Sequence, residues 1–206
     1  MQMSSEFLIT SLIVVISPGT GALYTIATGL GSGVKQSLIA AVGCTLGIIP
    51  HMLAAITGLA AIFHTSAAAF GIIKFLGVIW LLYMAWITLK QNGPLQVEST
   101  SETATPLKVI VHAVLINLLN PKLSLFFLAF LPQFISTETI SPTHDMLILS
   151  GIFMLMTLLI FMLYGVFSSF MRGHILSRPK VMRILRASFS LSFIGLGIKL
   201  ILTQRE

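Results

Sequence analysis

The sequence predicts an all-α integral membrane protein with six transmembrane helices, arranged as two inverted three-helix repeats. Hydrophobic residues make up 56% of the chain and charged residues 9%, and the mean hydropathy is +0.99. Soluble domains carry roughly a quarter of their residues as charged side chains, so this composition excludes a soluble enzyme or binding module. Long apolar stretches, and a proline at a matching place in each half, support the same fold class.

A membrane-spanning helix needs about 20 apolar residues, because backbone polar groups cannot stay unpaired in lipid. The predicted helices cover residues 7–30, 38–63, 67–89, 107–135, 146–170 and 187–202. The last is the shortest and needs Arg186 and Arg205 to hold its ends at the interfaces. The fourth would reach roughly 43 Å at about 1.5 Å per residue, so we expect it to begin in the interface and to break at Asn120-Pro121.

A polar stretch rich in Ser, Thr and Glu divides the chain into two halves. The predicted organisation is one membrane domain over residues 1–206, with a first repeat at 1–90, a cytoplasmic linker at 91–106 and a second repeat at 107–206. Each half holds three helices, and this odd number forces the second half to enter the membrane in the opposite sense. Pro18 and Pro121 interrupt the first helix of each half, so we expect helices 1 and 4 to be broken there.

The distribution of Lys and Arg predicts the topology. If the N-terminus is outside, the inner loops hold eight cations: Lys35, Lys90, Lys108, Arg172, Arg178, Lys180, Arg183 and Arg186. The outer side then holds only Lys199 and Arg205 near the C-terminus, which favours both termini outside. The net charge of +6 is therefore assigned to topology, and no nucleic-acid partner is expected. The first segment has no basic n-region, so we expect it to remain in the mature protein rather than act as a signal peptide.

The two proline breaks predict a substrate site. Proline has no N–H, so the carbonyls of Val14 and Asn117 are freed near the middle of the membrane, and a new half-helix presents N–H groups beyond each break. A zwitterionic amino acid offers a carboxylate for such N–H groups and an ammonium for such carbonyls. The predicted substrate-binding residues are Ser17, Pro18, Gly19, Thr20, Asn117, Asn120, Pro121 and Lys122. The alternative is that both prolines are harmless kinks.

Lys122 adds a charge to the second break. It lies about 14 residues from either end of its segment, too deep to reach an interface at low energetic cost. No Asp or Glu lies in the middle of any predicted helix. We therefore expect the ammonium of Lys122 to bind a carbonyl, a water or an anionic group of the substrate.

His51 is the candidate for proton coupling. It follows Pro50 halfway along the second predicted helix, and it is the one group near the middle of the membrane that titrates close to neutral pH. A proton carried on this imidazole could be exchanged for substrate. The alternative is a hydrogen-bonded histidine that bridges two helices.

Several other function classes lack their residue patterns. There is no G-x-x-x-x-G-K-[ST] motif for an ATP-driven pump, and neither H-E-x-x-H nor a Ser–His pairing for a membrane enzyme. We therefore expect no catalytic residues and no cofactor. No metal site is expected either, because the histidines are scattered. Export of another small solute or a metal ion remains an alternative, as does a channel, and saturable ion-coupled flux would separate carrier from pore.

Short motifs over nearly the whole chain resemble the LysE/RhtB family of amino-acid exporters. They are Ser17-Pro18-Gly19, Gly43-x3-Gly47, Gly58-Leu59-Ala60, Lys74-x2-Gly77, Leu82-Tyr83, Asn117-Leu118-Leu119-Asn120-Pro121-Lys122, Phe126-Phe127 and Leu131-Pro132-Gln133-Phe134. The resemblance implies a homodimeric exporter in the bacterial cytoplasmic (inner) membrane, working as an antiporter driven by the proton gradient. It implies amino acids or close derivatives as substrates.

Two departures from the family pattern narrow the resemblance. Many members read Pro-Gly-Pro-Asn at the first break, where this chain reads Pro18-Gly19-Thr20-Gly21, and many carry an acidic residue where this chain has Ile48. Both departures, together with His51, resemble the homoserine/threonine exporter branch, which implies neutral substrates of the homoserine, threonine or homoserine lactone type. The missing acid argues against lysine, because nothing anionic remains to pair with a second ammonium.

Overall fold

The structure, a computed structural model, describes residues 4–17, 19–62, 105–135 and 140–171, with isolated positions between residues 75 and 86 and between residues 187 and 202. Regular structure in these residues is helical throughout, which confirms the predicted all-α class. Pro18, most of the third predicted helix, more than half of the sixth and most of the linker at 91–106 lie outside the described residues.

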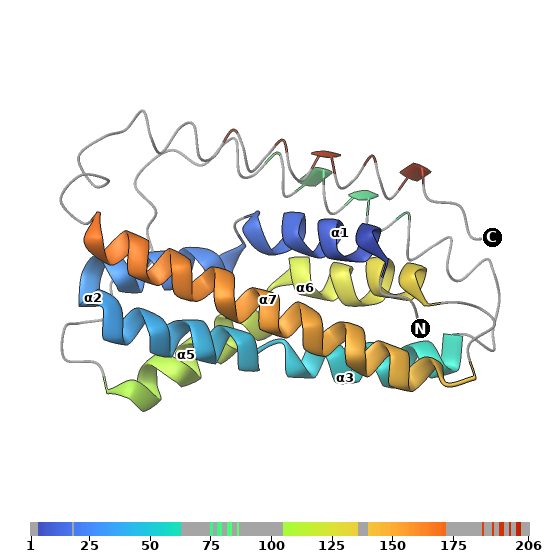
Figure 1. Cartoon of the computed structure of the whole chain (residues 1–206), viewed down its shortest axis with the longest axis horizontal. Helices are drawn as coiled ribbons and strands as arrows, with labels where there is room; N and C mark the ends of the chain where they lie inside the picture. Colours follow the sequence, from blue (N-terminus) through green and yellow to red (C-terminus); the bar gives the residue numbers. More distant parts are fainter. Residues whose placement is uncertain are drawn as a thin grey trace.

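Eight helical elements are described (Figure 1). They are α1 (Ser5–Ile16), α2 (Thr20–Leu46), α3 (Ile49–Ile62), α5 (Pro106–Leu118), α6 (Pro121–Leu125), a π-helical turn η1 (Phe126–Phe130), a 3-10 turn η2 (Leu131–Phe134) and α7 (Pro142–Phe170).

The described helices are apolar enough for a membrane. The stretches Thr20–Gly58 and Pro142–Phe170 each have the length and composition to cross one. α5 and the segment Lys122–Phe134 meet at an angle of 53°, and they make a further crossing if they are taken as one broken span. The six crossings, the inverted repeat and the orientation of the termini remain predictions.

The outer surface of the described helices is apolar, unlike that of a soluble protein. Large apolar residues four positions apart cover the exposed face of α7: Leu155, Leu159, Leu163 and Phe167. Hydroxyl side chains on its other face are buried, and they donate to the carbonyl one turn earlier, as Ser150 does to Met146 and Thr157 to Phe153. Such a surface suits lipid, and the interior keeps the polar groups.

α2 folds back on itself at Gly33. This residue has φ 82° and ψ −176°, a conformation that glycine adopts without steric strain. A Cβ on Gly21 would lie 2.5 Å from Oδ1 of Asn117, and one on Gly47 would lie 2.8 Å from Cβ of the same residue. A straight helix would hold Gly21 and Gly47 about 39 Å apart, so the two halves of α2 must run in opposite directions, as Figure 1 shows. The stretch from Thr20 to Gly58 is therefore a helical hairpin and not one long helix.

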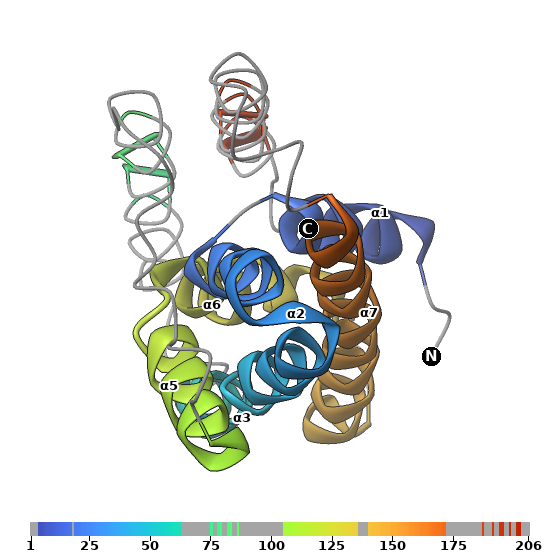
Figure 2. The ribbon, with the colours of Figure 1, turned by 90° about the vertical axis from the view of Figure 1, so that its left-hand side faces the viewer.

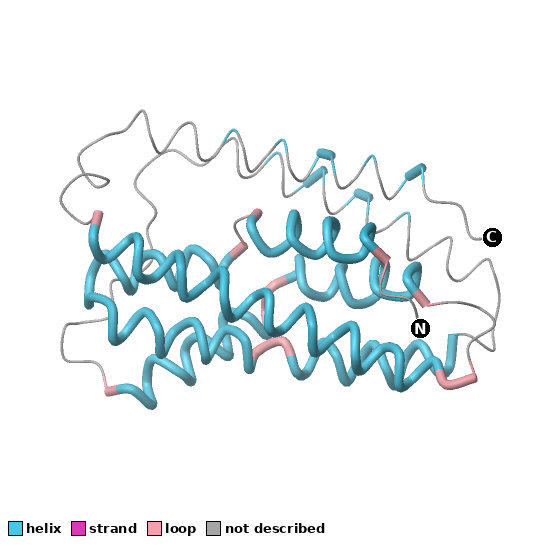
Figure 3. Tube along the Cα trace, in the orientation of Figure 1, coloured by secondary structure: helices cyan, strands magenta, loops and turns pink. Residues whose placement is uncertain are grey.

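α2 lies at the centre of the bundle. It packs most extensively against α7 and α5, and in the view along the molecule it lies between them (Figure 2). α1 and the segment from α6 to η2 run antiparallel, because the ring of Phe7 lies 5.4 Å from that of Phe134 while Ser17, just beyond the other end of α1, contacts Lys122. The non-helical residues that follow α1, α2 and α5 lie at similar positions along the long axis (Figure 3).

The observed boundaries correct two predictions. The second predicted helix, residues 38–63, is interrupted at Gly47 and Ile48. Pro50 explains this, since it has no N–H to donate to the carbonyl of Leu46. The fifth predicted helix began at residue 146, whereas α7 begins one turn earlier with Pro142, a residue type that favours the first helical position.

Candidate functional site

The two helix breaks meet through the side chain of Lys122. Its Nζ donates to the carbonyl oxygen of Val14 at 3.0 Å and to that of Ser17 at 2.6 Å. Only 5% of Lys122 is exposed, so its ammonium is held by backbone dipoles inside the bundle. The sequence predicted a carbonyl as one of three possible partners, and the carbonyls come from the opposite break.

Other residues of the first break also contact the second. The hydroxyl of Thr20 donates across the breaks to the carbonyl of Ile116 at 3.3 Å. The carbonyl of Ser17 binds Lys122, while the hydroxyl of Ser17 stays within the first break and donates to the carbonyl of Val14 at 3.0 Å. A Cβ on Gly19 would lie 3.0 Å from Nδ2 of Asn120. Ser17, Gly19 and Thr20 therefore line one side of the contact between the breaks. Pro18 lies outside the described residues.

The two helix N-termini at the breaks differ in how they are capped. Oδ1 of Asn120 accepts from the backbone N–H of Lys122 at 3.1 Å, so α6, which begins with Pro121, has its own cap. Gly19 occupies the cap position of α2, and no described side chain caps that helix. The first-turn N–H groups of α2 thus form the uncapped positive end of a helix dipole beside Lys122.

Asn117 links the elements around the breaks. Its Nδ2 donates to the carbonyl of Cys44 in α2, and its Oδ1 accepts from Nδ2 of Asn120 at 3.1 Å. Asn117 is 1% exposed, and every one of these partners is buried. Two glycines face it, Gly21 in α2 and Gly47 directly after α2, and a Cβ on either would lie 2.8 Å or less from an atom of the Asn117 side chain.

His51 binds both sides of the second break. Its Nε2 lies 3.0 Å from the carbonyl oxygen of Asn117, and its Nδ1 lies 3.2 Å from the hydroxyl oxygen of Ser124. A carbonyl can only accept, so Nε2 carries a proton, and Nδ1 of the neutral ring accepts from the hydroxyl. His51 therefore bridges α3 to α5 and α6, and its Nδ1 remains a position at which a proton can bind.

The carbonyls that the sequence predicted to be freed have protein donors. That of Val14 accepts from Ser17 and Lys122, and that of Asn117 accepts from His51. Described acidic side chains are confined to the first turns of α1 and α7, where Glu6 and Asp145 stand. Within the described part of the chain, Lys122 therefore has backbone carbonyls and no carboxylate as partners.

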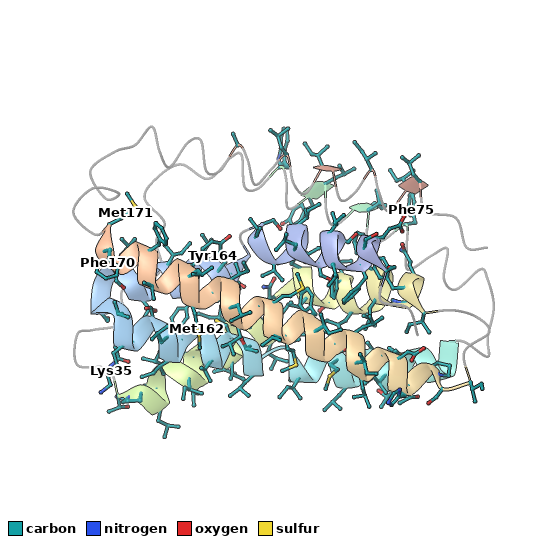
Figure 4. All side chains as sticks on the ribbon, in the orientation of Figure 1. Lys35, Phe75, Met162, Tyr164, Phe170 and Met171 are labelled. Atoms are coloured by element: carbon teal, nitrogen blue, oxygen red, sulfur yellow. The ribbon has the colours of Figure 1, made fainter. Side chains whose placement is uncertain are left out.

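Two residues at the site were missed by the sequence reasoning. The hydroxyl of Tyr164 in α7 donates to the carbonyl of Ile16 at 2.8 Å, where α1 ends (Figure 4). The hydroxyl of Ser124 holds His51. Ser124 lies two positions after Lys122, which could have drawn attention to it, whereas no local signal marks Tyr164.

Sequence comparisons with known proteins match nearly the whole chain. The sequence profile of the LysE type translocator family matches residues 12–204. A leucine efflux protein of Enterobacter sp. (strain 638) is 27% identical over 199 residues, covering 94% of this chain and 92% of that protein. A homoserine/homoserine lactone efflux protein of Salmonella typhimurium is 29% identical over 132 residues, covering 64% of each. An uncharacterized membrane protein of Vibrio cholerae is 29% identical over 198 residues, covering 94% of each. No solved structure matches significantly.

Proposed function

This chain belongs to the LysE type translocator family, and we propose that it is a secondary active exporter of neutral amino acids or their derivatives, coupled to proton antiport. The family and the efflux relatives are transporters, so the protein is a membrane transporter and not an enzyme. The relatives are named for efflux of leucine and for efflux of homoserine and homoserine lactone, and none of these solutes has a charged side chain, which supports this substrate class.

The observation that carries the proposal is the ammonium of Lys122 beside the uncapped N-terminus of α2. A Cβ on Gly19, the cap residue of α2, would lie 3.1 Å from Nζ of Lys122. A carboxylate between the two would meet a charged donor and the positive end of a helix dipole together. We propose that the substrate carboxylate binds at this point. A basic amino acid would bring a second ammonium, for which the described site holds no carboxylate.

Alternating access is proposed to follow from an inverted repeat. α1 and α6 run antiparallel on either side of the two breaks, which supports two halves of opposite sense. A rocking motion of one half against the other would then expose the site to each side of the membrane in turn. Six crossings, both termini outside, a homodimer and a place in the bacterial inner membrane complete the proposal.

His51 is proposed as the proton-coupling residue. Protonation at Nδ1 would reverse the hydrogen bond with Ser124, because the hydroxyl can accept as well as donate. The bond from Nε2 to the carbonyl of Asn117 would be kept in both states. Proton binding would therefore change the bonding of α6 while His51 stays anchored to α5.

Efflux from reconstituted vesicles tests the proposed function. Purified protein is placed in liposomes loaded with labelled L-leucine, L-homoserine, L-threonine or L-lysine, and a pH gradient is imposed. We expect saturable efflux of at least one neutral amino acid, and this efflux should be faster when the outside is more acidic than the lumen, so that protons enter as the amino acid leaves. Lysine should leave no faster than it does from protein-free liposomes. If every neutral amino acid leaves no faster than it does from protein-free liposomes, the proposed function is refuted. Efflux that neither saturates with substrate concentration nor responds to the pH gradient would indicate a channel.

A further inference from the structure

We propose that Lys122 acts as an internal substitute for the substrate's ammonium group, and that substrate binding displaces it. Between transport events the Lys122 ammonium would donate hydrogen bonds to the carbonyl oxygens of Val14 and Ser17. When the carrier is loaded, the ammonium of the substrate would donate to the same two oxygens. Lys122 would thereby set the preference for a zwitterion over an amine that has no carboxylate. This inference rests on the proposed function, because it concerns the same site.

The carbonyl pair has the properties of an ammonium site. Both oxygens lie at the broken end of α1, where the residue that would bond to Val14 in a continuous helix is Pro18, which has no N–H. They lie 3.0 Å and 2.6 Å from one nitrogen, and Val14 and Ser17 are buried. An ammonium is a compact cation with three donors, and Lys122 supplies one on a flexible stem of four carbons.

A bound carboxylate gives Lys122 a stronger partner than the carbonyls. The bonds from the ammonium to the carbonyls are already charge-assisted, but a carboxylate adds the attraction of a full opposite charge, whereas a carbonyl offers only a dipole. A Cβ on Gly19 would lie 3.0 Å from Cε and 3.1 Å from Nζ of Lys122, so the side chain already reaches the uncapped start of α2. Rotation of the stem alone would carry Nζ to a carboxylate there, with no backbone movement. The carbonyls of Val14 and Ser17 would then be open to the substrate's own ammonium.

This exchange explains why both charges of the solute matter. An amine without a carboxylate finds the carbonyls of Val14 and Ser17 already occupied by Lys122, so it competes poorly. A carboxylate without an amine draws Lys122 away, which takes the described side-chain donor from the buried carbonyl of Ser17 and leaves that of Val14 with the Ser17 hydroxyl alone. Removing a donor from a buried carbonyl is unfavourable. Replacing Lys122 with methionine removes the cation and keeps an unbranched side chain of similar length. The preference should then reverse, because the carbonyls are free for an amine and nothing charged remains for a carboxylate.

Equilibrium binding to the full-length protein in detergent tests the inference, using whichever of L-leucine and L-homoserine the wild type exports. Calorimetry compares L-leucine with L-leucinamide, or L-homoserine with L-homoserine lactone, in the wild type and in Lys122→Met. The matched control is Lys35→Met, the same change at an exposed lysine next to the Gly33 turn of α2 (Figure 4). We expect Lys122→Met to bind the zwitterion about 10- to 100-fold more weakly. It should bind the amine more tightly than the wild type does, and Lys35→Met should match the wild type.

Each outcome separates the two proposals. A wild type that exports neither zwitterion would overturn the proposed function, and this inference with it. An exporting wild type whose folded Lys122→Met variant keeps the preference for the zwitterion would overturn this inference alone. If Lys122→Met fails to elute as a single folded species, Lys122→Gln replaces it. Its uncharged amide cannot pair with a carboxylate as an ammonium does, so the zwitterion should again bind more weakly, and its weaker bond to the carbonyls should leave the amine bound no less tightly than in the wild type. An amine affinity that falls together with the zwitterion affinity in both variants would likewise refute the exchange.

Discussion

Gly21→Ala tests how closely the two helix breaks approach each other. Gly21 lies in the first turn of α2, and a Cβ at this position would lie 2.5 Å from Oδ1 of Asn117 and 3.1 Å from a ring carbon of Phe161. The Asn117 amide cannot move away freely, because its Nδ2 bonds to the carbonyl of Cys44 and its Oδ1 accepts from Asn120. The added methyl group must therefore push α2 and α5 apart or break these bonds.

The size of the effect follows from this geometry. Overpacking a well-packed interior costs about 1–3 kcal/mol, and for a chain of this length each kcal/mol lowers the melting temperature by about 2–4 °C. We expect the apparent melting temperature of Gly21→Ala in detergent to fall by about 2–12 °C. Export should fall as well, because the same shift moves the N-terminus of α2 away from Lys122. Thermal unfolding monitored by circular dichroism, together with the vesicle efflux assay, measures both effects.

Gly151→Ala is the matched control, since a Cβ on this residue of α7 meets nothing within 4 Å. Alanine is the better helix former by about 1 kcal/mol, so this variant should melt at the wild-type temperature or above it. In a double variant, Asn117→Ala removes the amide against which the methyl group added by Gly21→Ala collides. The two substitutions together should then cost less than the sum of the two alone. A Gly21→Ala protein that melts and exports like Gly151→Ala would refute the close approach of α2 to α5.

Three further variants test the remaining contacts. Tyr164→Phe removes the 2.8 Å bond to the carbonyl of Ile16, so it should lower the melting temperature by about 2–4 °C and slow export. A variant with an unchanged melting temperature and export rate would mean that the hydroxyl does not hold the end of α1. Asn120→Ala removes the cap of α6 and should destabilise the protein by about 1 kcal/mol, measured in the same melting experiment; a wild-type melting curve would contradict the cap. His51→Gln keeps a donor for the carbonyl of Asn117 but loses the imidazole that would carry the proton, so an imposed proton gradient should no longer speed export. Export that the gradient still accelerates would exclude His51 from coupling.

The positions of the breaks could be predicted because they depend on local chemistry. Proline lacks an N–H wherever it stands, so a break after α1 and another after α5 follow from the residue type alone. The need of Lys122 for a polar partner is equally local, because a buried ammonium in an apolar segment without acidic residues must find backbone or substrate oxygen. The interruption at Gly47 and Ile48 follows the same rule through Pro50, and it was missed because only the two prolines at matching places in the halves were taken as breaks.

The sequence by itself determined that this chain is helical, suited to a membrane, and broken at two places that carry polar groups. Tertiary structure alone decided that Lys122 binds Val14 and Ser17, more than 100 positions earlier, and that Tyr164 bonds to the end of α1. Helices for a lipid environment carry large apolar residues on their buried and their exposed faces alike, so their sequence pattern does not reveal which face meets which neighbour. That choice is made by the fit of small residues such as Gly21 against larger ones such as Asn117, and this fit exists only once the helices are packed.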